Sequence, residues 1–164
     1  MFEPANLLRV SHALVGVWFL AGLIGRWVTL GQAARSTEIG PIQQMLTLSA
    51  RFERIVVLGS VGVLILGIAT AVAQGRPFLG PFQGAPVDWL FVSLVLFLSV
   101  LPLIPLVFLP RGRVFSAALN EAVAEGAITA RLQAAFRDRV VLAAHAYELA
   151  AMVVVLVLMI AKPF

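Results

Sequence analysis

The side chains most able to do chemistry lie inside an apolar run near the end of the chain. Residues 140–161 are long enough to cross a bilayer core of about 30 Å, and they enclose His145 and Glu148. In a helix, side chains three positions apart share one face. Because a carboxylate facing lipid costs about 2.5–3.5 kcal/mol or more, we expect this face to look at protein or at water. The pair is then either an internal hydrogen bond that stabilises helix packing or, since a buried carboxylate can carry protons, a proton site.

A second histidine, His12, lies near the start of the first apolar run. Neutral imidazole is a common ligand, so His12 is a candidate ligand for haem or a metal. The alternative is structural, with His12 donating to a backbone carbonyl or to Asp88. Counted from opposite membrane faces, His12 and His145 should differ in depth by about 15 Å. We therefore do not expect one haem to be held by both histidines.

Most catalytic and cofactor motifs are missing from the sequence. The absence of cysteine excludes iron–sulfur clusters, thiolate metal sites, disulfides and cysteine nucleophiles. The sequence also has no nucleophile elbow, no phosphate-binding loop and no His-Glu-x-x-His zinc motif. It therefore assigns no catalytic residue and no metal site, and it favours a role other than catalysis.

The composition is that of a membrane protein. Hydrophobic residues make up 61% of the chain and charged residues only 12%, and the mean hydropathy is +1.00. The basic residues are mostly arginines between apolar runs, so they indicate membrane topology and not nucleic-acid binding. We expect the lipid bilayer as the main partner, together with other membrane helices in a homo- or hetero-oligomer.

Four apolar runs define the expected fold, an all-α integral membrane four-helix bundle in a single domain, residues 1–164. The spans are expected at about 7–27, 55–73, 87–109 and 140–161.

The third span carries several local signals. Pro102 and Pro105 lie deep in it and should kink the helix by freeing carbonyls from helical bonding. Asp88 should cap the helix start, and Trp89 should sit in the interfacial aromatic belt.

Short amphipathic cytoplasmic helices are expected between the spans. Residues 29–40 should form a polar connection, followed from Ile42 by an amphipathic helix that lies at the membrane surface and runs into the second span. Residues 114–125 should form a short polar-faced helix that ends at Gly126. Thr129 should then cap one long final helix.

The basic residues also predict the orientation. Arginine 26, 35, 51, 54, 111, 113, 131, 137 and 139 fall in the first and third connections, whereas only Arg9, Arg76 and Lys162 fall at the termini or in the second connection. By the positive-inside rule both termini are outside. Arg26 itself, next to Trp27, looks like an interfacial anchor.

Several short motifs together resemble a known family. They are His12-Ala-Leu-Val-Gly-Val-Trp18 in the first span, the charged entry Arg51-Phe-Glu53-Arg54 to the second, Trp89 at the third, and the terminal Met159-Ile-Ala-Lys162-Pro163. The chain resembles a bacterial family of predicted integral membrane proteins of unknown function. That family is distantly similar to the membrane domain of copper resistance protein D and to the haem-binding protoporphyrinogen oxidase family. The resemblance implies a bacterial inner-membrane location, with haem b or a metal at His12.

Three classes of function follow from the sequence. The first is an interaction or accessory membrane subunit, because glycine and alanine seams let helices approach closely. The second is a haem- or metal-handling membrane protein that uses His12. The third is a proton-linked small carrier that uses Glu148, although four spans without inverted repeats are few for a carrier.

Overall fold

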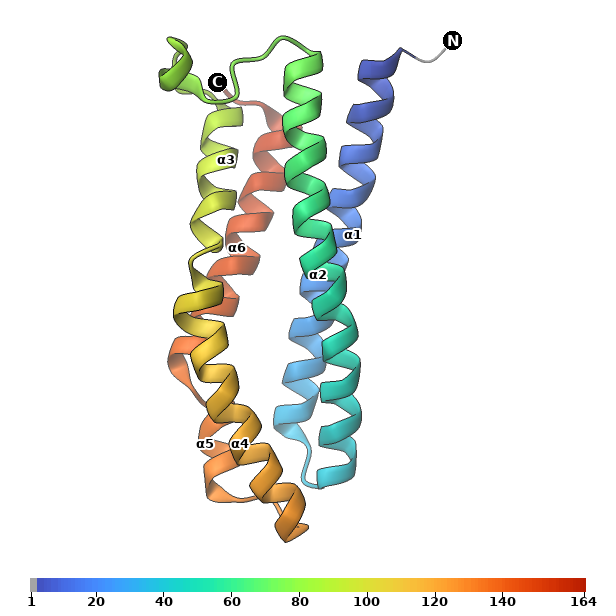
Figure 1. Cartoon of the computed structure of the whole chain (residues 1–164), viewed down its shortest axis with the longest axis vertical. Helices are drawn as coiled ribbons and strands as arrows, with labels where there is room; N and C mark the ends of the chain where they lie inside the picture. The colour runs from blue at the N-terminus through green and yellow to red at the C-terminus, as the bar shows by residue number, and fades with distance from the viewer. Residues whose placement is uncertain (1–2) are drawn as a thin grey trace.

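Every regular element in the part of the chain that the computed structural model describes, residues 3–164, is a helix (Figure 1). The α-helices are α1 (Pro4–Arg35), α2 (Ile39–Ala73), α3 (Trp89–Val100), α4 (Leu109–Glu125), α5 (Ala130–Phe136) and α6 (Arg139–Ala161); a 3-10 helix, η1 (Gly80–Gln83), and a π-helix, η2 (Ile104–Phe108), complete the fold. Four helical segments are long and apolar enough to cross a membrane. The expected all-α, four-span membrane bundle is confirmed.

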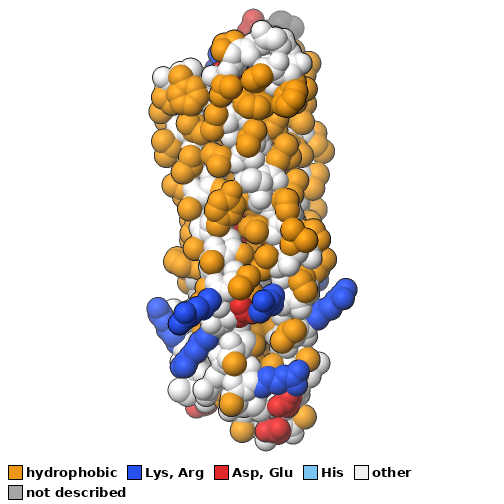
Figure 2. Space-filling model, turned by 90° about the vertical axis from the view of Figure 1, so that its left-hand side faces the viewer, with side chains coloured by type: hydrophobic (Ala, Val, Ile, Leu, Met, Phe, Trp, Pro, Cys, Tyr) orange, Lys and Arg blue, Asp and Glu red, His pale blue; other side chains and the backbone are white. Residues whose placement is uncertain are grey.

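The helices extend well beyond the apolar zone at one end of the bundle. Lysine and arginine side chains gather in a belt at one level in Figure 2, with an almost unbroken hydrophobic surface on one side of it. Residues 55–73 of α2 and 140–161 of α6 lie on that side and measure about 29 and 33 Å at 1.5 Å per residue, close to one bilayer core. On the other side of the belt the helices continue as a stalk, which we define as residues 27–54 and 110–138.

The stalk corrects two expectations about the first connection. Residues 29–40 are not a loop, because α1 continues to Arg35 and α2 begins at Ile39. The amphipathic segment after Ile42 does not lie on the membrane surface but continues in line with the second span (Figure 1). The physical reason is burial: α1 and α2 pack along each other, and Ala33 and Ile42 are 0% and 1% exposed.

The bundle has two separate hydrophobic cores. The core on the membrane side contains Phe19, Leu23, Val56, Phe97, Val100, Ala151 and Met152. The stalk core contains Ile42, Ala118, Ala122 and Leu132. The stalk helices therefore bury apolar faces against one another instead of against lipid.

Glycines account for the close packing of α1 on α2. A Cβ at Gly22 would lie 2.7 Å from Ile55 Cγ2, and one at Gly59 would lie 2.8 Å from Phe19 Cβ. Real Cβ atoms do not tolerate such contacts, so these positions need glycine. The small-residue seams of the first two spans are used within this chain.

The prolines interrupt the third span as expected. α3 ends at Val100, and the π-helix η2 starts at Ile104, on either side of Pro102. The backbone N–H groups of Leu101 and Ile104 donate to carbonyls three residues back, at 3.2 and 3.1 Å. The carbonyls that the prolines free are thus bonded again locally, which is how an interrupted helix is tolerated in a membrane.

The last span lies where expected, but its helix begins later than expected. Thr129 caps only the short helix α5, accepting from Leu132 N–H at 3.1 Å. The chain then breaks at Arg137, and Asp138 caps α6 by accepting from Val140 N–H at 3.0 Å. The prediction of one long helix starting at Thr129 was wrong because Asp138 supplies a second N-cap.

Trp89 also differs from the expectation. Asp88 caps α3 as expected, accepting from Phe91 N–H at 2.9 Å. Trp89, however, is buried at 8% exposure and is not part of an exposed aromatic belt. Arg76 and Lys162 lie 5.6 and 5.5 Å from its ring, so Trp89 joins the second connection to the C-terminal end through cation–π contacts.

Candidate functional site

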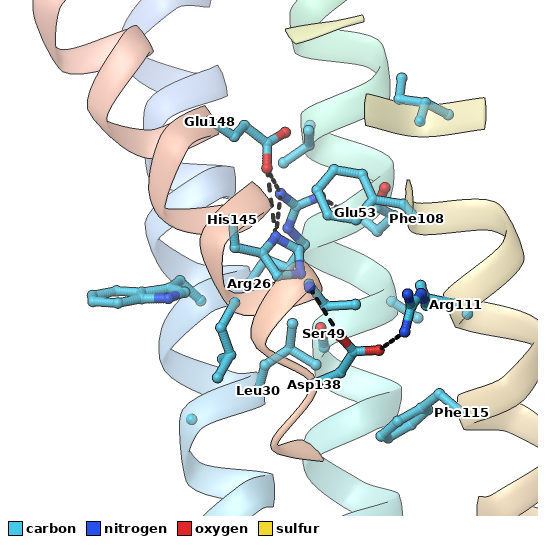
Figure 3. Close-up of a pocket in the computed structure, with 18 of the residues that line it drawn as sticks. Arg26, Leu30, Ser49, Glu53, Phe108, Arg111, Phe115, Asp138, His145 and Glu148 are labelled. Carbon is cyan, nitrogen blue, oxygen red and sulfur yellow. Dashed lines mark hydrogen bonds and ion pairs between the residues drawn. The ribbon is translucent and has the colours of Figure 1, made fainter. Parts of the chain in front are cut away.

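A cluster of charged side chains joins three helices at the centre of the bundle. Arg26 of α1 donates from Nη1 to Glu53 Oε2 of α2 at 2.6 Å. Its Nη2 donates to Glu148 Oε2 of α6 and lies 3.3 Å from His145 Nδ1 (Figure 3). We call these four residues the Arg26 cluster. Arg26 and Glu148 are each 6% exposed, so their charges depend on each other for compensation.

Arg26 is the member of the cluster that the sequence reasoning missed. An arginine next to a tryptophan at the end of an apolar run normally anchors a helix at the interface. Trp27 does face outward, at 50% exposure, but Arg26 points into the bundle. Helical spacing could have indicated this inward direction. Arg26 lies four residues after Gly22 and three before Thr29, so it shares their helix face, and both of these residues are buried.

Glu148 faces the bundle, as its position in the apolar run predicts, and its partner is Arg26 of another helix. The His145 Nδ1 and Glu148 Oε2 atoms are 3.6 Å apart, which is too long for a hydrogen bond. The pair is therefore held together through Arg26 and not by a direct bond.

The contact with Arg26 also fixes the state of the His145 ring. A guanidinium has only donors, so His145 Nδ1 must accept from Arg26 and carries no proton in this arrangement. The ring stacks on Phe108, with centroids 4.6 Å apart and planes at 24°. The imidazole is neutral here, and the cluster holds one guanidinium and two carboxyl groups.

A large cavity opens beside the cluster, between the membrane core and the stalk core. Its volume is about 1030 Å³, and its wall is mostly apolar. Glu53, whose side chain is 50% exposed, and Ser49 line it on α2. Across it, Arg111 donates to Asp138 Oδ2 at 2.7 Å (Figure 3). The cavity combines apolar walls with a few fixed polar groups, which is typical of sites for small molecules.

His12 lies apart from this site. It packs between α1 and α2, where a Cβ at Gly67 would be 3.0 Å from its Cε1. Its Nδ1 atom is buried without a hydrogen-bond partner. Fourteen residues separate it from Arg26, about 21 Å along α1. Among the described residues no group of three or more His, Cys, Asp or Glu side chains forms a metal site.

The fold and the cluster define the class of the protein. The chain is a small multi-pass α-helical membrane protein whose spans are tied together by a buried ion cluster beside a cavity. It belongs to the family described as predicted integral membrane protein (DUF2269), which matches residues 6–163. Comparisons with curated proteins and with solved structures found no match.

Proposed function

We propose that the chain binds an amphipathic small molecule in the cavity between its two cores. The observation that carries the proposal is the cavity of about 1030 Å³ beside an ion cluster, at the level where the spans leave the apolar zone. Ligand sites are mostly apolar concavities with a few well-placed polar groups, and this cavity has both properties. An amphipathic ligand fits this cavity, because its apolar body matches the apolar walls and its polar head matches the ion cluster.

An accessory-subunit role stays a prediction with weaker support than the sequence alone suggests. The glycine seams that favour partner helices are used against residues of this chain, as at Gly22 and Gly59. On α6, Ala144 and Ala151 are also buried internally. Exposed small residues such as Ala143 and Ala150 are what remains for a partner helix.

Haem or metal handling at His12 has no support from the geometry. Neither of the two described cavities includes His12 in its lining. The His12 ring lies against Gly67, and its Nδ1 atom is enclosed without a hydrogen-bond partner. Ligation by His12, like the distant similarity to haem-binding families, therefore stays a prediction.

The test narrows the cavity at one position of its lining. Gly31 lines the cavity, and a Cβ built on it meets nothing within 4 Å, so Gly31→Phe should add a ring to the lining without a clash at Cβ. Gly16 has the same open surroundings outside the cavity, so Gly16→Phe is the matched control. Binding of the neutral apolar dye N-phenyl-1-naphthylamine is followed by quenching of tryptophan fluorescence, since Trp27 lines the cavity.

We expect saturable binding in the original protein and in Gly16→Phe, and its loss in Gly31→Phe. If Gly31→Phe binds the dye as well as the control variant does, the cavity is not a ligand site and the proposal fails.

A further inference from the structure

We propose that the ligand of this cavity is an organic cation, which binds beside the Arg26 cluster and compensates its excess negative charge. The inference rests on the proposed function, because it names the class of molecule that the same cavity takes. It comes from the charge count of the cluster and from the side chain that the cluster presents to the cavity.

The cluster carries one negative charge more than it can compensate. Arg26 contributes one positive charge, Glu53 and Glu148 contribute two negative ones, and His145 accepts a hydrogen bond as a neutral ring. Glu148 is buried and Glu53 is half exposed, so the excess charge can be compensated by a cation that reaches the cluster from the Glu53 side.

Glu53 is the group through which a cation can reach this excess charge. Both carboxylates line the cavity, but the side chain of Glu53 is 50% exposed, whereas the side chain of Glu148 is only 8% exposed. Among the contacts of the described residues, Glu53 bonds to Arg26 only through its Oε2 atom, which leaves Oε1 for a ligand. Arg26 cannot move to serve a ligand without breaking its bonds to both carboxylates.

The other charged groups around the cavity do not compensate the excess negative charge of the cluster. Arg111 and Asp138 neutralise each other at 2.7 Å. Arg35 lies nine residues beyond Arg26 on α1, about 13 Å away along the helix, at the stalk end of the cavity. The excess negative charge is thus local to Glu53 and the cluster.

Aromatic rings near the cluster also favour a cation. Phe108 stacks on His145, and Arg26 already lies 5.7 Å from the Phe108 ring centre. Phe97 and Trp27 line the same cavity. Aromatic faces attract cations, and their apolar bodies suit the organic part of such a ligand.

The test compares two probes of the same shape and opposite charge, tetraphenylphosphonium and tetraphenylborate. Both are titrated against the purified protein by equilibrium dialysis, and cavity binding is the part that Gly31→Phe removes. We expect tetraphenylphosphonium to bind roughly tenfold tighter or better.

Glu53→Gln should remove the preference for the cation, and Glu125→Gln, a change at an exposed carboxylate on α4 outside the cavity lining, should keep it. The comparison of the two probes can be made on the unmodified protein, so this part of the test does not depend on whether a cluster variant folds.

Two failures can be told apart. If tetraphenylborate binds as well as the cation while the neutral dye still binds, the charge assignment is wrong and the proposed function stands. If neither ion nor the dye shows binding that Gly31→Phe removes, the proposed function itself fails.

Discussion

At the scale of single residues, Arg26 is the side chain on which the site depends. It is 6% exposed and bonds to carboxylates from two other helices, so it joins α1, α2 and α6 at one point. Removing Arg26 leaves Glu148 as a buried, uncompensated charge, and breaking a buried ion pair in this way typically costs about 3–5 kcal/mol. Removing the charge of one carboxylate should cost less than removing Arg26, because it brings the net charge of the cluster closer to zero.

This asymmetry gives a prediction for stability. Arg26→Met should lower the free energy of unfolding by about 3–5 kcal/mol, since it leaves Glu53 and Glu148 facing each other. Glu148→Gln should cost about 1 kcal/mol or less, because an amide still accepts from Arg26 and the net charge of the cluster becomes zero. Denaturation in mixed micelles measures both changes.

The double variant Arg26→Met with Glu148→Leu should recover part of the Arg26→Met loss, because a buried charge disappears with its partner. Equal stability losses for Arg26→Met and Glu148→Gln would show that the cluster is not balanced as we describe.

The sequence could reveal part of this site but not its centre. His145 and Glu148 stand out because polar residues inside an apolar run must face protein or water. Arg26 stands at the end of such a run, where an outward-pointing side chain costs nothing, so its inward direction depends on the tertiary contact. Glu53 lies between two exposed arginines and gives no local signal of its role.

At the scale of the elements, local signals determined where helices break, and long-range packing determined where they continue. Pro102, Asp138 and Gly126 mark real interruptions, because each acts on the backbone beside it. The continuation of α1 and α2 beyond the belt could not be read locally. Their polar residues resemble a loop or a surface helix, and only the facing helices supply the apolar contacts that extend them into a stalk.

At the scale of the whole molecule, the belt of basic side chains separates a membrane part from a stalk (Figure 2), and α1 begins and α6 ends at the end of the bundle opposite the stalk (Figure 1). The first and third connections thus lie at one end, and the second connection at the other. This is the arrangement that four spans require. We propose that the stalk faces the cytoplasm of a bacterial inner membrane, because its end carries most of the arginines.

Fusion reporters test that orientation. Alkaline phosphatase fused after Phe164 should be active, because we expect the C-terminus in the periplasm, where this enzyme folds with its disulfides. A green fluorescent protein fused at the same place should stay dim, and one inserted after Glu125, between α4 and α5, should be bright. The reverse pattern would place the stalk outside.

The central claim is that a small molecule occupies the cavity between the two cores, and thiol protection measures it most directly. The chain has no cysteine, so Gly31→Cys places a single thiol on the cavity wall, and Gln43→Cys places one on the exposed surface of the same stalk. Both are labelled with a maleimide, with and without saturating N-phenyl-1-naphthylamine. We predict that the dye slows labelling at residue 31 several-fold and leaves residue 43 unchanged; equal labelling rates at residue 31 with and without the dye would contradict the account.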